Sequence, residues 1–247
     1  MDETVESMIK NGDLLLQKEK VMDAIREYTK AFETIGSNED EDTADLSYRL
    51  SQAYNSLESK NDENSKKYAE ISLRIHQKMG DKDLEILDYL NLGYIEMYAR
   101  KKDESERFFK QAFDMAKAID DPFLVSTALN AAAELKSESV KERKSAMEIY
   151  EQVLKISKET EDWENYFEAV RGKISLVRAS GEEDTALKQA LEAVGFIDEL
   201  CAKIKNKKER KEFKKSLSFI YDTASDIAME LENVDEAIKI AQRSNSE

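Results

Sequence analysis

The stretch that decides the fold is LDYLNLGYIEMYARKKDESERFFKQAFDMA, Leu87 to Ala116. Its apolar residues recur three and four positions apart in two runs with a charged segment between them, which predicts two helices joined by a short link. Gly93 lies inside the first run, although a glycine there costs roughly 1 kcal/mol relative to alanine. We expect close contact with the second helix, near Ser105 and Phe109, to offset that cost.

The same arrangement recurs along the chain. Five segments each carry a small residue, then Tyr, Phe or Ala four positions later, and then a mostly small residue seven positions later. These offsets lie on one face of a helix. The leading residues are Ala24, Ser65, Ser105, Ala146 and Ala186, spaced by 41, 40, 41 and 40 positions. The helix before each segment carries a matching small residue: Gly12, Ser51, Gly93, Ala132 and Gly172. This regular period predicts a repeat protein.

The residues of the motif indicate which type of repeat this is. Leu92-Gly93 followed by a tyrosine, and then Ser105, Phe109 and Ala112, resembles the tetratricopeptide repeat (TPR), in which helix A carries Leu-Gly and Tyr and helix B carries Ala, an aromatic residue and Ala. The resemblance covers nearly the whole chain. The period here is 40 to 41 residues, whereas the ordinary repeat has about 34. The closing proline of the family is missing, and the chain is similar to the long-repeat type typified by kinesin light chain.

The fold that follows is all-α. One proline and seven glycines are too few for the turns of a sheet protein of 247 residues. We expect a right-handed α-solenoid of stacked antiparallel helix pairs, with about twelve helices in a single TPR-like domain over residues 1–247. Gly36, Gly80 and Gly181 are placed to end helices, and Asp121-Pro122 is placed to begin one.

The net charge is −15, from 38 basic and 53 acidic residues. An acidic surface repels phosphate backbones and anionic lipids, so we expect neither a nucleic acid nor a membrane partner. From the sequence we expect neither a signal peptide nor a spanning segment, and it has one cysteine, Cys201. We therefore expect a cytoplasmic protein without an internal disulfide.

Residues for catalysis are scarce. The one histidine, His76, lies near an expected helix end, where we expect a surface or capping side chain. Cys201 has no second histidine to activate it. The acidic run NEDED, residues 38–42, lacks the glycine of a calcium loop and favours the start of the next helix. We expect no enzymatic activity, no metal site and no cofactor.

The resemblance implies a binding surface instead. In TPR proteins the A helices line a concave groove, and transferring the family's groove positions gives Tyr48, Arg49, Gln52, Asn55, Asn91, Tyr94, Tyr98, Asn130 and Lys173. Asn91 and Asn130 fall where the family uses an amide to hold a ligand's backbone. The alternative interpretation is that the tyrosines pack between helices and the asparagines face water.

A second feature is a basic segment on this acidic chain. The spacing from Ala186 to Ala237 is 51 residues, which breaks the period, and we expect an irregular junction near 200–215 before a helix over 207–231. The segment CAKIKNKKERKEFKK has eight basic and two acidic residues, a local charge of 8 − 2 = +6. It is either an exposed helix end or a docking patch for an acidic partner. The patch residues would be Lys205, Lys207, Lys208, Arg210, Lys211 and Lys214.

These features favour a non-enzymatic scaffold that binds a peptide or protein segment in the concave groove. Two alternatives stay open. One is a module that assembles with itself through its solenoid ends, as a homodimer for example. The other is a regulatory sensor whose curvature responds to a peptide.

Overall fold

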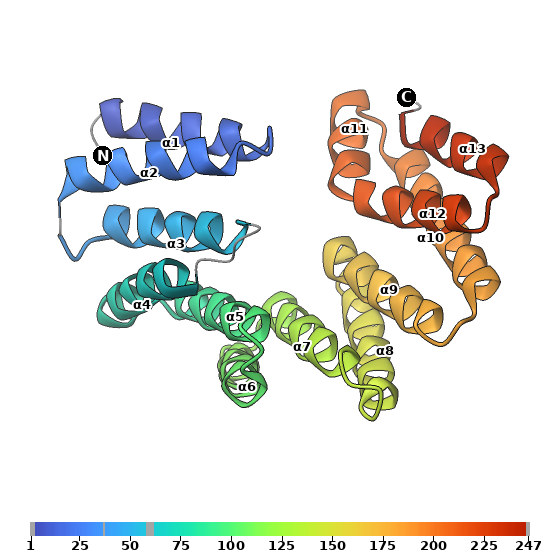
Figure 1. Ribbon diagram of the computed structural model, residues 1–247, viewed down its shortest axis with the longest axis horizontal. Helices are drawn as coiled ribbons and strands as arrows, with labels where there is room; N and C mark the ends of the chain where they lie inside the picture. Colours follow the sequence, from blue (N-terminus) through green and yellow to red (C-terminus); the bar gives the residue numbers. More distant parts are fainter. Residues whose placement is uncertain (1–2, 37, 58–61, 246–247) are drawn as a thin grey trace. The chain divides into compact units, whose positions relative to one another are not determined.

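The computed structural model describes residues 3–36, 38–57 and 62–245, and within these ranges it contains helices and no strand (Figure 1). The expected all-α fold is confirmed. The described residues form thirteen helices: α1 Glu3–Leu16, α2 Val21–Ile35, α3 Glu41–Asn55, α4 Asp62–Met79, α5 Lys82–Tyr98, α6 Lys102–Ala118, α7 Pro122–Ser137, α8 Arg143–Glu159, α9 Trp163–Arg178, α10 Glu183–Lys203, α11 Lys207–Ser216, α12 Ser218–Glu230 and α13 Val234–Asn245.

The chain divides into two compact units, Met1–Ala131 and Ala132–Glu247. In the first unit the successive pairs α1–α2, α3–α4 and α5–α6 pack closely, and α2–α3 and α4–α5 contacts join one pair to the next. In the second unit α9 packs between α8 and α10, and α12 packs between α10 and α13. Most of these contacts join helices that are neighbours in the sequence, as in a repeat stack, whereas α12 packs on α10 more than on α11.

The repeat pattern marks the packed face. All fifteen pattern positions of the five expected B helices are buried. Each of the five leading small residues is 0% exposed: Ala24, Ser65, Ser105, Ala146 and Ala186. Small side chains at these points allow neighbouring helices to approach closely.

The glycines of the A helices lie against aromatic rings of partner helices. A methyl group added at Gly93 would come within 3.0 Å of two ring carbons of Phe109, and Gly12 faces Tyr28 in the same way. This confirms the contact expected between Gly93 and the second helix. Gly172 instead meets Tyr150, which lies on the preceding helix α8. In the second unit, the ring that packs on the glycine therefore comes from the preceding helix and not from the following one.

Helix ends follow the expected chemistry. The carboxylate of Asp121 accepts a hydrogen bond from Leu124 N at 3.0 Å, and α7 begins at Pro122. Asp40, from the acidic run, accepts one from Thr43 N at 3.0 Å. Gly80 follows α4 with φ of 76°, a left-handed conformation that glycine adopts without the steric cost of a side chain, and Gly36 and Gly181 have φ of 77° and 79°.

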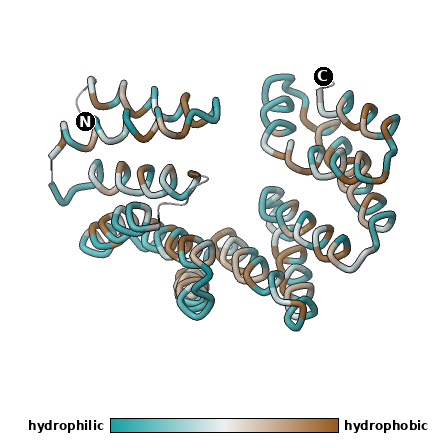
Figure 2. Tube along the Cα trace, in the orientation of Figure 1, coloured by the Kyte–Doolittle hydropathy of each residue, from teal (hydrophilic) through white to brown (hydrophobic). Residues whose placement is uncertain are grey.

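The prediction of a single helix over residues 207–231 is wrong. This segment forms two helices, α11 and α12, with an interruption at the buried residue Leu217. In one straight helix, Arg210 and Lys214 would share a stripe with Tyr221 and Ala224, because these positions lie three, four or seven residues apart. The stripe is apolar and packed in α12, whereas no residue of α11 is buried. Figure 2 shows α11 as hydrophilic along most of its length. The interruption separates the basic helix α11, which has no buried residue, from the packed helix α12.

Candidate functional site

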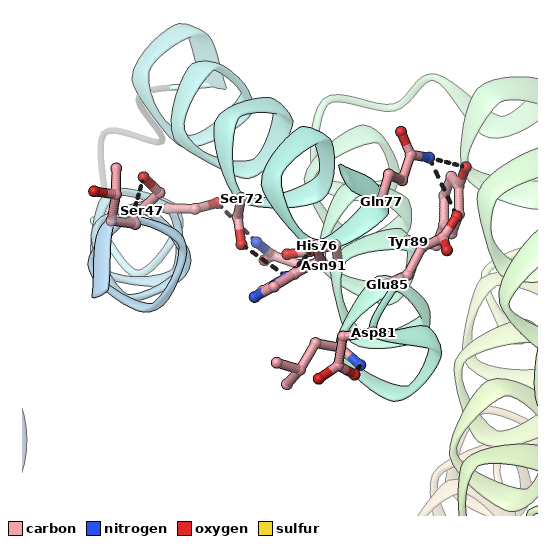
Figure 3. Close-up of polar contacts among 12 residues, drawn as sticks. Ser47, Ser72, His76, Gln77, Asp81, Glu85, Tyr89 and Asn91 are labelled. Carbon is pink, nitrogen blue, oxygen red and sulfur yellow. Dashed lines mark hydrogen bonds and ion pairs between the residues drawn. The ribbon is translucent and has the colours of Figure 1, made fainter. Parts of the chain in front are cut away.

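All but one of the predicted groove residues of the first unit lie on α3 and α5, and one hydrogen bond joins these helices. The amide nitrogen of Asn91 donates to Ser51 Oγ at 2.8 Å (Figure 3). The two residues are forty positions apart, one repeat period, so the bond ties corresponding points of consecutive A helices. We call the surface formed by Tyr48, Gln52, Asn55, Asn91, Tyr94 and Tyr98 the A-helix face.

The bond changes what Asn91 can contribute. Its side chain is 6% exposed and its amide nitrogen is already engaged by Ser51. One of its two amide N–H groups, which the family resemblance implied would hold a ligand, is therefore used within the protein. Its main role in this structure is to fix how α3 and α5 pack.

Arg49 is likewise engaged within the protein. Its guanidinium group contacts Asp13 of α1 at 2.6 Å and Asp45, one turn earlier, at 2.9 Å. Asp13 also accepts a hydrogen bond from the Tyr28 hydroxyl at 2.6 Å. The arginine thus joins α1 to α3, and any ligand that used it would compete with two carboxylates.

Two further groove residues of α3 are half-buried. Burial first, and then the charge of Asp88, raises the pKa of Tyr48 to about 12. Asn55 lies one turn beyond Ser51, and its Oδ1 is buried without a hydrogen-bond donor from the described residues. A buried acceptor without a donor costs about 1 to 3 kcal/mol.

Of the remaining members of the face, Gln52 and Tyr98 are exposed and Tyr94 is half-buried. Gln52 is exposed, and Tyr98 is 38% exposed. The rings of Tyr94 and Tyr98 stack with centroids 6.2 Å apart, and Tyr94 also meets Phe109 edge-on at 5.1 Å. Tyr94 is thereby anchored to the core contact of Gly93, while Tyr98 extends the aromatic surface outward.

The last two predicted groove residues lie apart in the sequence. Asn130 is half-buried on α7, at the end of the first unit. Lys173 is half-buried on α9 in the second unit, where it forms an ion pair with Glu151 of α8. Within its own unit, Lys173 therefore joins two adjacent helices.

The basic segment forms one wall of a cleft in the second unit. The cleft has a volume of about 790 Å³. Its lining residues are Asp198, Cys201, Ala202, Lys207, Arg210, Lys211, Lys214, Lys215, Ser218 and Ser244. Four of the six predicted patch residues are among them, whereas Lys205 and Lys208 are exposed and do not line it. Lys215 was missed, although its spacing of four from Lys211 places it on the same helix face.

The floor of the cleft is a polar network around Asp198. Arg243 Nε and Nη2 donate to Asp198 Oδ2 at 3.0 and 2.8 Å, and the Tyr221 hydroxyl donates to Oδ1 at 2.7 Å. Lys214 Nζ lies 3.6 Å from the same carboxylate. Asp198 is the one acid among the lining residues, and its charge is shared between two cations.

His76 is buried, contrary to the expected surface or capping position. Its side chain lies between α4 and α5, near Ser72 (Figure 3), with Nδ1 2.6 Å from Asp88 Oδ2. Burial alone would lower the pKa of His76, but the hydrogen bond and charge of Asp88 outweigh it and raise the pKa. Sequence position gave no sign of this pair, because its partner comes from the next repeat. The pair is a structural contact between repeats.

Other chemistry is limited. Among the described residues, no three His, Cys, Asp or Glu side chains are grouped so that they could hold a metal ion. None of the helices described here is long and apolar enough to cross a membrane.

The chain matches no family model and no curated protein in sequence. It is similar to a solved Rap protein complexed with Competence and Sporulation Factor, at 15% identity and a TM-score of 0.66, over 96% of this chain and 72% of that one. It is also similar to a STAND signal transduction ATPase with a TPR sensor from Pyrococcus horikoshii, at 17% identity and a TM-score of 0.61, over 99% of this chain and 36% of that one.

A third similar structure consists of kinesin light chain TPR-like repeats from Podosopora anserina, with 15% identity and a TM-score of 0.58. That match covers 78% of this chain and 94% of the other. At these identities the likeness concerns the fold. The chain is a helical-repeat protein with a TPR-like fold, as the glycine and small-residue pattern predicted.

Proposed function

We propose that this chain is a non-enzymatic scaffold that binds a peptide or protein segment on the A-helix face of its first unit. The observation that carries the proposal is the combination, on α3 and α5, of a stacked tyrosine pair, of which Tyr98 is exposed, with the exposed amide of Gln52. Tyr94 and Tyr98 supply apolar area with polar ends. Gln52 and the Oδ1 of Asn55 supply a hydrogen-bond donor and acceptors that the described residues leave available.

The composition of this face is suited to peptides. Amides pair with a backbone whatever its sequence, and tyrosines are enriched at protein interfaces. The rigid Asn91–Ser51 contact fixes the spacing of the two helices, which lowers the entropy cost of binding. Structures with the same fold support the proposal, since one is complexed with a factor and another is described as a sensor.

The test begins with selection of binders from a random peptide library on the full chain. The variant Gln52→Ala with Tyr98→Ala should weaken the selected peptides by on the order of tenfold, because truncating contact residues typically costs 1 kcal/mol or more. The matched control is Gln111→Ala with Phe123→Ala, which removes an exposed amide and an exposed ring from α6 and α7. Equal weakening by both variants would exclude this face.

Asn55 gives a second readout that separates binding from folding. Asn55→Ala removes a buried acceptor that lacks a donor, so the free energy of unfolding should not fall. The selected peptide should nevertheless bind several-fold more weakly. A variant that loses stability and keeps full affinity would show that Asn55 serves only the fold.

A second candidate is a regulatory sensor, which is favoured by the similarity to a protein whose TPR region is described as a sensor. In that case the selected peptide should change hydrogen exchange in helices of the second unit as well as in α3 and α5. Protection confined to α3 and α5 would be consistent with a scaffold and would contradict the sensor function.

A further inference from the structure

The cleft of the second unit concentrates positive charge on a protein of net charge −15. We propose that it binds a carboxylate-rich segment of a partner protein in an extended conformation. The site consists only of residues of the second unit, so it does not depend on the A-helix face.

The charge balance of the cleft is the first argument. Five lining residues of α11 are cationic and one lining residue, Asp198, is anionic, which gives 5 − 1 = +4. Asp198 is shared between Arg243, which does not line the cleft, and Lys214, which does. Within the described residues, Lys211 and Lys215 form no ion pair. Cations gathered in a cleft repel one another, and an anionic ligand would relieve that repulsion.

The orientation of α11 is the second argument. Its lining residues recur three and four positions apart, so they form one face of the helix. The two acids of α11, Glu209 and Glu212, lie off that face, and Glu212 pairs with Lys208 at 3.8 Å. An ordinary exposed helix mixes both signs toward solvent. Here five of the six cations of α11 face the cleft, and both acids face away.

The spacing of the lysines indicates which kind of ligand fits the cleft. Lys207, Lys211 and Lys215 follow one another at intervals of four residues, or about 6 Å along a helix axis. Alternate side chains of an extended chain point the same way at intervals of about 6.6 Å. A segment with Asp or Glu at every second position therefore places its carboxylates opposite the three lysines. A compact phosphate group would engage only cations that converge on one point.

The cleft also has room for such a segment. A volume of about 790 Å³ lies within the range of ligand-binding clefts. Its remaining walls are Cys201, Ala202, Ser218 and Ser244. These side chains are small, so they leave the backbone of an extended segment room beside the lysines.

The experiment measures binding of a fluorescent peptide of about seven residues, alternating Glu and Ser, to the full chain by anisotropy. The variant Lys211→Ala with Lys215→Ala should weaken binding on the order of tenfold. The matched control, Lys205→Ala with Lys208→Ala, removes the same charge outside the cleft and should change affinity by less than about twofold. Equal effects of the two variants would overturn the site, because only net charge would then matter.

Cys201 reports on the same cleft directly. It is the one cysteine of the chain, it lines the cleft, and it is 6% exposed. Saturating peptide should slow maleimide labelling of Cys201, and the Gln-Ser analogue at the same concentration should not. Unchanged labelling with bound peptide would overturn the proposal. Tighter binding of inorganic tripolyphosphate or of a single-stranded oligonucleotide than of the peptide would overturn the assigned occupant.

Discussion

The α5–α6 pair and helix α11 use their sequence patterns in opposite ways. In α5–α6, Gly93 and Phe109 interlock, and the repeat-pattern residues Ser105 and Ala112 are buried. In α11 no residue is buried, and the regular spacing belongs to cations that face a cleft. The same helical period thus specifies packing in one region and a charged surface in the other. The difference lies in the size and charge of the side chains and not in their spacing.

The largest expected effect comes from breaking the interlocked pair. Gly93→Ala should lower the free energy of unfolding by about 2 kcal/mol, because the added methyl group would overlap the ring of Phe109, which is 1% exposed. Urea denaturation followed by circular dichroism would measure the change. A neutral or stabilising effect would show that the ring moves aside freely.

The buried charges of the same region provide the next test. Burial lowers the pKa of His76, but the hydrogen bond and the charge of Asp88 outweigh burial. The pKa of His76 is therefore raised above its ordinary value of 6.5. The folded protein therefore holds this proton more tightly than the unfolded chain. The resulting stability is fully present below about pH 6.5 and is lost as pH rises through the raised pKa. Burial also raises the pKa of Asp88, which acts in the same direction.

Asp88→Asn isolates that contribution. The stability advantage of the parent chain over the variant should shrink by about 1 kcal/mol between about pH 6 and pH 9. Denaturation midpoints of the two proteins across this range would show it, since all other titrating groups are common to both. A difference that stays constant with pH would mean that the pair carries no proton linkage.

A glycine with no aromatic ring packed against it provides a control for Gly93. Gly195 lies within α10, and a methyl group added there would meet nothing within 4 Å. Gly195→Ala should therefore stabilise the chain by about 0.5 to 1 kcal/mol, through the better helix propensity of alanine. Thermal or urea denaturation measures it beside Gly93→Ala. Loss of stability at both positions would mean that the ring contact is not the cause.

The smallest effect is expected in α11. Lys211→Ala with Lys215→Ala should leave the free energy of unfolding within about 0.5 kcal/mol, because both side chains are exposed. Removal of like charges should make any change slightly stabilising. A clear loss of stability would indicate that these lysines support the fold and are not reserved for a ligand.

Local pattern accounted for the helices and their buried face. The small residues at positions 24, 65, 105, 146 and 186 follow from spacing alone, since a helical face is a local property. The contacts between repeats could not be predicted from this spacing. The Asn91–Ser51 and His76–Asp88 contacts join different repeats, and Gly172 meets a ring of the preceding helix. Such pairings depend on how the helices stack, which the period does not specify.

The break at Leu217 was missed for a related reason. Residues 207–231 read as one helical stripe, because lysines three or four positions from apolar residues satisfy the same periodicity. The break separates a helix with no buried residue from one that buries Tyr221 and Ala224 in the core, and this change is not visible in the periodicity. The sequence did identify the basic segment, but the cleft appears only when α10, α12 and α13 are placed beside α11.

The most direct test of the glycine–aromatic contact is the effect of Gly93→Ala measured in two backgrounds, the parent chain and Phe109→Ala. With the ring present, the added methyl group should lower the free energy of unfolding by about 2 kcal/mol. With the ring removed, the same substitution should be neutral or stabilising by up to about 1 kcal/mol. An equal loss of stability in both backgrounds would contradict the account.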